Sequence, residues 1–345
     1  MKLVAHAADA LGHVRGGVDE RQRTRLFILQ AQANHLQGRL HEAVESAEQA
    51  VHRARWIADT QLLGQALTER ARSARAIGEL SQAQGALREA LTLLEGAAKA
   101  EVALEMGAVL SDLGAIDDAS EALQVARSEF MLVGHRMGLA NSLRWLGDLA
   151  LRRGDVAWAA TLLEAARQGY DELGSAWGAM SCHNSLGELW RAKGDLEGAE
   201  RHYRAASSLA RAMDALDALV PDVNRALVLE LQGRHREAGF ILRKCLNQAD
   251  QRGARLLSAI CHVALLPTLA ATQEWDALDT HYALGNSLLR ETGYVHGDIA
   301  QLARRAADRS RGSRKDALLR MAVVQYRQLG QLKDVAELKA MLPSA

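Results

Sequence analysis

The sequence predicts an all-α protein, more specifically a right-handed α-solenoid of antiparallel helix pairs, and three observations point to this class. Ala and Leu, two strong helix formers, supply 63 and 54 of the 345 residues. Pro occurs only three times and β-branched residues are sparse, so a sizeable sheet is not expected. Glycines divide the apolar stretches at a nearly constant interval, which is typical of a protein built from a repeated helical unit.

The glycine interval defines that unit. Steps of 40, 36, 40, 40 and 39 residues separate six glycines, and a further step of 40 reaches Gln273. In four units another glycine falls 20 residues later, so each unit is cut into two helices of roughly 15–17 residues. Because one such pair cannot bury its apolar stripe alone, stacked pairs are expected to share one core. The six glycines are Gly38, Gly78, Gly114, Gly154, Gly194 and Gly233.

The repeat sets the expected organisation of the chain. Residues 1–20 are expected to be the remnant of an upstream helical unit, residues 21–293 to form seven helix pairs, and residues 294–345 to form an irregular C-terminal helical cap. The expected pairs are 21–37 with 41–56, 60–77 with 81–95, 99–113 with 117–132, 137–153 with 157–172, 176–193 with 197–213, 216–232 with 236–251, and 254–272 with 276–292. The cap is expected to contain helices near 297–310, 316–329 and 332–342.

Charge balance and missing motifs argue against several classes of function. The 42 Lys and Arg residues equal the 42 Asp and Glu residues, which gives no electrostatic footprint for nucleic acid or an anionic membrane. The chain has no run of 18 apolar residues, and its amino terminus lacks the apolar core of a signal peptide. Phosphate-binding loops and the common hydrolase motifs are missing too. We therefore expect no enzyme activity, no cofactor, no direct nucleic-acid binding and no membrane partner.

The cysteines bear on location and on metal binding. None of the three lies in a CxxC spacing, which fits a reducing cytoplasm better than a disulfide scaffold. Cys182-His183 and Cys261-His262 are repeated 79 residues apart. A shared ion would need these ligands within about 2–2.3 Å of it, whereas units two apart in a stack are separated by roughly 20 Å. The sequence therefore predicts a cytoplasmic protein without a metal site.

Two stretches resemble the tetratricopeptide repeat (TPR). One begins at Leu143 and the other at His183, and each carries a Leu-Gly pair followed by glycine and small residues at the family spacing. The helix-ending Pro of the family is absent, and the period is 40 residues. This longer period resembles the TPR-like region of bacterial maltose-activator (LuxR-type) regulators and of bacterial kinases and adenylate cyclases fused to an NTPase module. Animal cell-polarity scaffolds with 40-residue repeats are a second match. The resemblance implies a TPR-like superhelix.

The resemblance also implies where a ligand would bind. In this family the first helix of each pair lines a concave groove and contacts the ligand. Asn suits an extended peptide there because its amide offers both a donor and an acceptor, and Arg suits carboxylates. The positions carried over are Thr68, Arg72 and Arg75 in the second unit, Asn141, Arg144 and Asp148 in the fourth, Asn184, Glu188 and Arg191 in the fifth, and Asn224 in the sixth.

Apolar residues distinguish the sixth and seventh units. Their inner face is expected to be apolar through Val220, Val223 and Leu227 in the sixth unit and Ile260 and Val263 in the seventh. An apolar patch beside a polar one favours a groove that binds a peptide or a partner helix. Trp145 and Trp177, near the start of first helices, are candidates for exposed anchors.

These observations predict a non-catalytic protein- or peptide-binding scaffold, acting as the sensor or interaction region of a bacterial signalling or transcriptional regulator. Two alternatives stay open. One is a small-molecule sensor, as the maltose-activator resemblance implies. The other is a self-assembly module in which exposed end repeats stack between chains. The sequence leaves the oligomeric state and the identity of the partner open.

Overall fold

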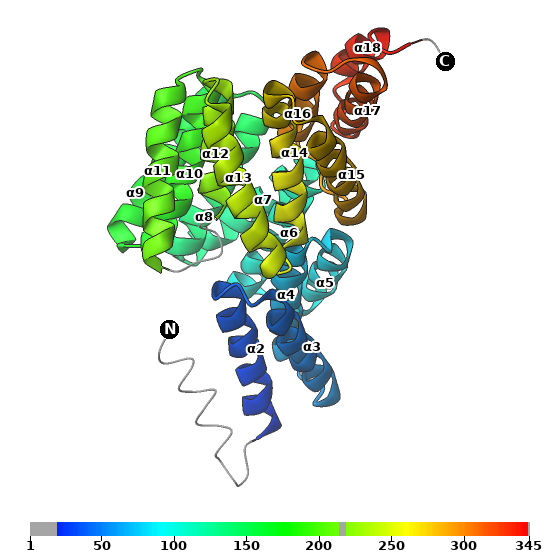
Figure 1. Cartoon of the computed structure of the whole chain (residues 1–345). Coiled ribbons are helices and arrows are strands. Elements are labelled where there is room, and N and C mark those ends of the chain that lie inside the picture. Colours follow the sequence, from blue (N-terminus) through cyan, green and yellow to red (C-terminus); the bar gives the residue numbers. More distant parts are fainter. Residues whose placement is uncertain (1–18, 214–218, 344–345) are drawn as a thin grey trace.

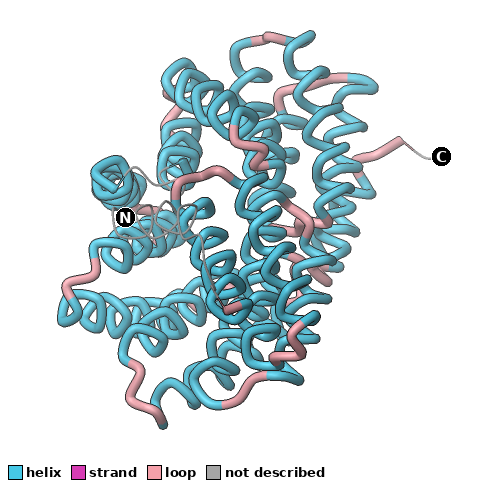
Figure 2. Tube along the Cα trace, turned by 90° about the horizontal axis from the view of Figure 1, so that it is seen from below, coloured by secondary structure: helices cyan, strands magenta, loops and turns pink. Residues whose placement is uncertain are grey.

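The computed structural model describes residues 19–213 and 219–343, and within these ranges the chain forms seventeen helices and no strand (Figure 1). Short loops join consecutive helices of the described ranges, as Figure 2 shows from below. The first helices of the pairs are α2 (Glu20–Leu36), α4 (Thr60–Ile77), α6 (Gly96–Asp112), α8 (Arg136–Arg152), α10 (Ala176–Ala192), α12 (Leu219–Leu231) and α14 (Arg255–Thr272). The second helices are α3 (Leu40–Trp56), α5 (Leu80–Leu93), α7 (Ile116–Leu132), α9 (Val156–Leu173), α11 (Leu196–Met213), α13 (His235–Gln251) and α15 (Trp275–Thr292). The chain closes with α16 (Gly297–Asp308), α17 (Gly312–Gln328) and α18 (Leu332–Ala340).

The predicted all-α class is confirmed, and the protein is an α-solenoid of stacked helix pairs. Helices begin and end within four residues of the predicted boundaries, apart from the start of the predicted helix 216–232, whose residues 216–218 lie outside the described ranges. Residues 1–18 of the predicted upstream remnant also lie outside the described residues.

Left-handed turns separate the helices where the spacing predicts them. All ten glycines of the two predicted sets have φ between 61° and 91°. Gln273, which continues the interval without a glycine, has a φ of 61°. The turn geometry is therefore kept even where the side chain makes a left-handed backbone less favourable.

Within three of the pairs, a glycine in the first helix allows the second helix to approach closely. A Cβ added to these glycines would lie only 2.4–2.8 Å from a large buried side chain of the following helix. The glycines lie 40 residues apart, and so do the side chains that they face. The sequence repeat is thus also a repeated packing contact. The glycines are Gly107, Gly147 and Gly187, and they face Leu123, Leu163 and Tyr203 in that order.

The stack does not remain open, because its C-terminal part returns to the N-terminal half. The backbone N–H of Val295, between α15 and α16, donates to the Asp112 carbonyl at 2.9 Å, and the Val295 carbonyl accepts from Arg152 Nη2 at 2.9 Å. Thr292 and Leu256 lie against the turn at Gly78. In Figure 1 the lower end of α14 meets α4.

The helix α14 occupies the centre of this return. In the described part of the chain it is the one helix that is long and apolar enough to cross a membrane, and 72% of it is buried inside the protein. It packs against α4, α12, α13, α15 and α16. Its apolar composition is therefore explained by neighbours that cover it on several sides.

Candidate functional site on the inner surface

Polar side chains of the first helices contact one another from unit to unit, and we call this row of contacts the inner surface. It runs over α2, α4, α6, α8, α10 and α12. Five of the predicted binding residues take part in contacts between these helices or between them and α16. The contacts between helices are Gln32 with Glu69, Arg72 with Glu105, Arg75 with Asp112, Arg152 with Ser111, Asn224 with Asn184, and Arg191 with Asp298. Arg191 also pairs with Glu188 of its own helix.

At the N-terminal end, Arg72 of α4 bridges two carboxylates. Its Nε donates to Glu105 of α6 at 2.8 Å, and its Nη1 is paired with Glu69 of its own helix. Burial acts to lower the pKa of Arg72, but the two carboxylates outweigh burial and raise it. Burial likewise acts to raise the pKa of Glu105, and Arg72 outweighs it, so this pKa is lowered. Both groups are therefore held in their charged forms.

A cavity of about 420 Å³ lies between α2, α4 and α6. Thr68, a predicted site residue, lines it, but the Thr68 hydroxyl is buried and donates to the Gly64 carbonyl at 2.8 Å. The cavity combines apolar walls with charges of both signs, so it can accept a side chain and a polar group together. Its other lining residues were not predicted, because they lie outside the positions carried over from the family. They include Arg25, Leu29, Gln32, Glu69, Leu94 and Glu101.

The middle of the inner surface carries the predicted residues of the fourth unit. Asn141 accepts a hydrogen bond from the Tyr170 hydroxyl at 2.7 Å, and Arg144 Nη1 donates to Asp148 at 2.8 Å. Burial raises the pKa of Asp148 although Arg144 acts to lower it. The buried Nε of Arg144 has no hydrogen-bond partner among the described residues.

Trp145 is not the exposed anchor that the sequence predicts. The guanidinium groups of Arg75 and Arg144 lie 5.2 Å and 4.5 Å from the centre of its ring, so the half-buried indole already contacts two cations of the protein. Trp177, at the start of α10, is 39% exposed and keeps the predicted accessibility. The two cation–π contacts hold the Trp145 ring in place.

The fifth unit binds the returning C-terminal segment. Arg191 donates to both carboxylate oxygens of Asp298, at the start of α16, at 3.1 and 2.9 Å. Glu188 accepts from Arg191 and from the Tyr203 hydroxyl. Burial acts to raise the pKa of Asp298, but Arg191 and His296 outweigh it, so the pKa is lowered. Glu188 and Arg191 are therefore occupied by contacts within the protein.

The predicted apolar face of the sixth unit is largely absent from the surface. Val223 and Leu227 are only 2% and 4% exposed and belong to the core, whereas Val220 is 38% exposed. The prediction that all three face an open groove is therefore wrong for two of them. The reason is that α13 and α14 pack against α12, whose apolar side chains belong to a core that also includes residues of α16.

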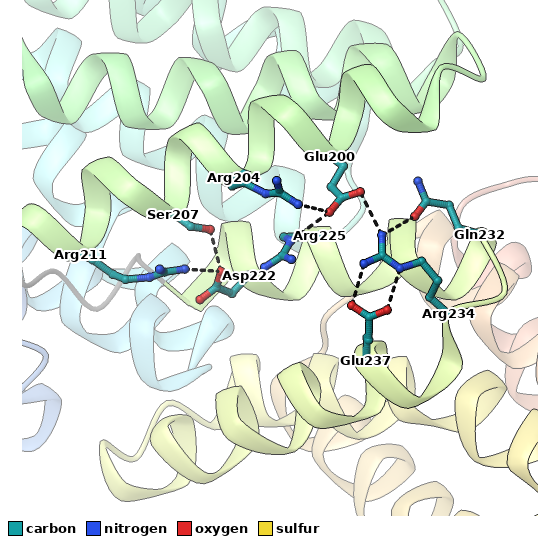
Figure 3. A network of polar contacts seen from close by, with 9 residues as sticks. All are labelled: Glu200, Arg204, Ser207, Arg211, Asp222, Arg225, Gln232, Arg234 and Glu237. Carbon is teal, nitrogen blue, oxygen red and sulfur yellow. Dashed lines mark hydrogen bonds and ion pairs between the residues drawn. The ribbon is translucent and has the colours of Figure 1, made fainter.

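A separate polar network joins α11, α12 and α13 (Figure 3). Glu200, whose side chain is mostly buried, faces three arginines, and Asp222 accepts from Ser207 at 2.7 Å. This network was not predicted, because its residues lie mostly on second helices and the predicted binding positions all lie on first helices. Since its charges pair among themselves, we assign it to holding the fifth and sixth units together. The three arginines are Arg204, Arg225 and Arg234.

The two Cys-His dipeptides do not come together. Both cysteines are buried, and burial raises the pKa of each thiol. Each histidine instead meets a second histidine on the following helix. In the described part of the chain, no three His, Cys, Asp or Glu side chains are grouped to hold a metal ion.

No protein-family model matches the chain, and no curated protein is similar enough to count as a match. Solved structures are similar along nearly its whole length. A Rap protein complexed with Competence and Sporulation Factor is 13% identical, with a TM-score of 0.68 over 99% of this chain and 90% of that one. The Rap conjugation gene regulator of plasmid pLS20, in complex with the Phr* peptide, is 13% identical, with a TM-score of 0.67 over 91% and 97%. NprR in complex with its cognate peptide NprX is 12% identical, with a TM-score of 0.66 over 93% and 92%. At these identities the similarity shows a shared TPR-like helical fold.

Proposed function

We propose that this protein is a non-catalytic regulatory scaffold that binds a short peptide on its inner surface. The observation that carries the proposal is the similarity, over more than nine-tenths of the chain, to two structures described as peptide complexes. A peptide on the inner surface would place the protein among bacterial cytoplasmic signalling or transcriptional regulators.

The amide groups of α10 and α12 support this assignment. Asn224 Nδ2 donates to Asn184 Oδ1 at 3.1 Å, and both side chains are half-buried. An amide has two donors and one acceptor oxygen, so this pair retains groups for the backbone of an extended peptide. The cavity between α2, α4 and α6 offers space for a ligand side chain at the other end.

The experiment is a selection of short peptides followed by measurement on matched variants. A displayed heptapeptide library is selected against the purified chain, and the selected peptides are titrated by fluorescence anisotropy. We expect the double variant Asn184→Ala, Asn224→Ala to weaken binding at least about tenfold, since lost hydrogen bonds to a ligand are each worth roughly 1 kcal/mol. Its melting temperature should hardly move, because both partners of the bond are removed and no buried polar group is left unpaired.

Asn247→Ala is the matched control, because this asparagine is exposed on α13. It should leave the affinity unchanged. Equal affinity of the double variant and the unmodified chain would overturn the assignment of the peptide to α10 and α12. The small-molecule and self-assembly alternatives stay predictions, and a metabolite thermal-shift screen and light scattering test them respectively.

A further inference from the structure

Two pairs of imidazoles occur at equivalent places in the fold. His183 of α10 and His202 of α11 bring their Nδ1 atoms within 3.0 Å, and His262 of α14 and His281 of α15 bring theirs within 2.7 Å. Each pair joins the first helix of a unit to its second helix. The two pairs lie 79 residues apart, which is two units along the stack.

The histidines occur at both positions of a unit or at neither. In the unit before the first pair the equivalent positions hold Leu143 and Leu162, and in the unit between the pairs they hold Asp222 and Ile241. The general repeat therefore does not require histidine. The duplication extends to surrounding residues, which recur at the same 79-residue interval. These are Asp171 and Asp250, Cys182 and Cys261, and Tyr203 and Tyr282.

The distance between the two nitrogens is that of the hydrogen bond between them, and it also equals the separation expected for a right-angled pair of metal bonds. Two nitrogens bound at about 2.0 Å to one ion lie about 2.8 Å apart at 90° and about 3.3 Å apart at a tetrahedral angle. The observed distances of 3.0 and 2.7 Å bracket the first value. Square-planar and tetragonal nitrogen sites are typical of Cu(II) and Ni(II).

The imidazoles are also in the protonation state that binds metal. Burial lowers the pKa of all four histidines, and for His281 it does so to about 4. Near pH 7 both rings of a pair are therefore neutral, as a metal ligand must be. In the present contact one Nδ1 donates its proton to the other. If that ring shifts its proton to Nε2, both Nδ1 lone pairs become available without net proton release.

We propose that each imidazole pair binds one divalent late transition-metal ion, of the Ni²⁺ or Cu²⁺ class, through its two Nδ1 atoms. No third protein ligand joins either pair in the described residues, so water fills the remaining positions. Each ion clamps α10 to α11 or α14 to α15. The sites are independent of the peptide proposal, because they lie in the packing between the two helices of a unit.

The test is a calorimetric titration of the untagged full chain with NiCl₂ in a non-coordinating buffer at pH 7.5. Two ions per chain are expected. His202→Gln and His281→Gln should each leave one ion, and the double variant should leave none, with affinity at the altered site falling at least about tenfold. A rise in melting temperature with Ni²⁺ should disappear in the double variant.

His52→Gln is the control, because this histidine is exposed on α3. It should still bind two ions. Where a Gln variant melts at a lower temperature, His183→Gln and His262→Gln remove the other ring of each pair and must give the same stoichiometry. The proposal is overturned if the unmodified chain binds no Ni²⁺, or if it binds the same number of ions after both pairs are disrupted.

Discussion

The two halves of the inner surface are held together differently. In the N-terminal half, the polar partners come from the neighbouring unit: Arg72 meets Glu105 and Arg75 meets Asp112, at 33 and 37 residues of separation. In the second half, partners also come from α16, far along the chain. Glu230 meets Arg305 at 75 residues of separation, and Arg191 meets Asp298 at 107.

This difference shows that the chain is stabilised both by contacts between adjacent units and by contacts between units far apart in the sequence. A solenoid normally depends on contacts between adjacent repeats, so that stability is close to a sum of local terms. The polar pairs of α4 with α6 follow that rule, and the loop at Val295 adds a closing contact to α6 and α8. The later units also depend on a closing contact, so a change in α16 should reach α10 and α12 directly while α2–α5 are affected little.

The largest expected effect comes from removing the arginines that neutralise Glu230. This carboxylate is 1% exposed and pairs with Arg305 at 3.0 Å and Arg309 at 2.8 Å. Arg305→Ala with Arg309→Ala leaves a buried charge unpaired, which costs about 3–5 kcal/mol. Urea denaturation measures the loss. Hydrogen exchange should rise in α12 and α16 and stay unchanged in α2–α5.

Arg304→Ala is the control on the same helix. Its partner Glu337 and its own side chain are both substantially exposed, so the cost should stay below about 1 kcal/mol. Faster exchange in α2–α5 of the double variant would contradict the division into two regions.

The next effect compares equivalent glycines in the two regions. A Cβ at Gly187 would lie 2.4 Å from the ring of Tyr203, whose hydroxyl is bonded to Glu188, whereas a Cβ at Gly107 would lie 2.5 Å from the more adaptable Leu123. Overpacking costs about 1–3 kcal/mol. Gly187→Ala should fall at the upper end of that range and Gly107→Ala at the lower end. Thermal melting of both variants checks the order, and a greater loss in Gly107→Ala would refute it.

A smaller effect depends on pH and is confined to the units with imidazole pairs. The pKa of His281 is lowered to about 4, by burial first and then by His262, while the unfolded value is near 6.5. Above pH 6.5 neither state binds the proton. Below it the unfolded chain takes up a proton that the folded chain resists, so stability falls as the pH is lowered toward 4.

The free energy of unfolding is measured by chemical denaturation at several pH values between 7.5 and 5. His262→Gln with His281→Gln should give a flatter profile than the unmodified chain. The charged groups near these rings, Asp250, Arg243 and Glu274, are kept in both proteins, so their contribution cancels. Parallel profiles would exclude a role for the pair.

The smallest expected effect is a gain in the N-terminal region. Gly85 lies exposed within α5, and a Cβ there would meet nothing within 4 Å. Gly85→Ala should therefore stabilise the protein by about 0.5–1 kcal/mol, since only the entropy cost of glycine in a helix is removed. Thermal melting checks the gain. A destabilised variant would show that α5 is constrained by more than its immediate neighbours.

The sequence was sufficient to predict the helices and their pairing into units. Residues such as Gly187 and Tyr203 have roles that local spacing encodes, because their contacts repeat every 40 residues. It also placed Arg72, Arg144 and Asn184 on one surface, where the structure joins them to other polar groups. Whether these groups bind a peptide stays a prediction.

The closing contacts could not be predicted in the same way. Asp298 and Val295 lie after the last regular unit, and their partners are set by the cumulative rotation of all the units between them. Small differences between units add up over that distance. For the same reason the burial of Val223 and Leu227 was missed, since the helices that cover them belong to a later part of the chain.

The hydrogen bonds of Val295 with Asp112 and Arg152 limit how the chain can evolve in length. Open repeat proteins gain or lose whole repeats by duplication and deletion, because every new unit finds the same neighbour. Here the insertion of one unit between α7 and α14 would carry Val295 past its partners by a full step of the superhelix. Only one number of units lets the closing contacts form, so selection for these contacts keeps the number of units constant.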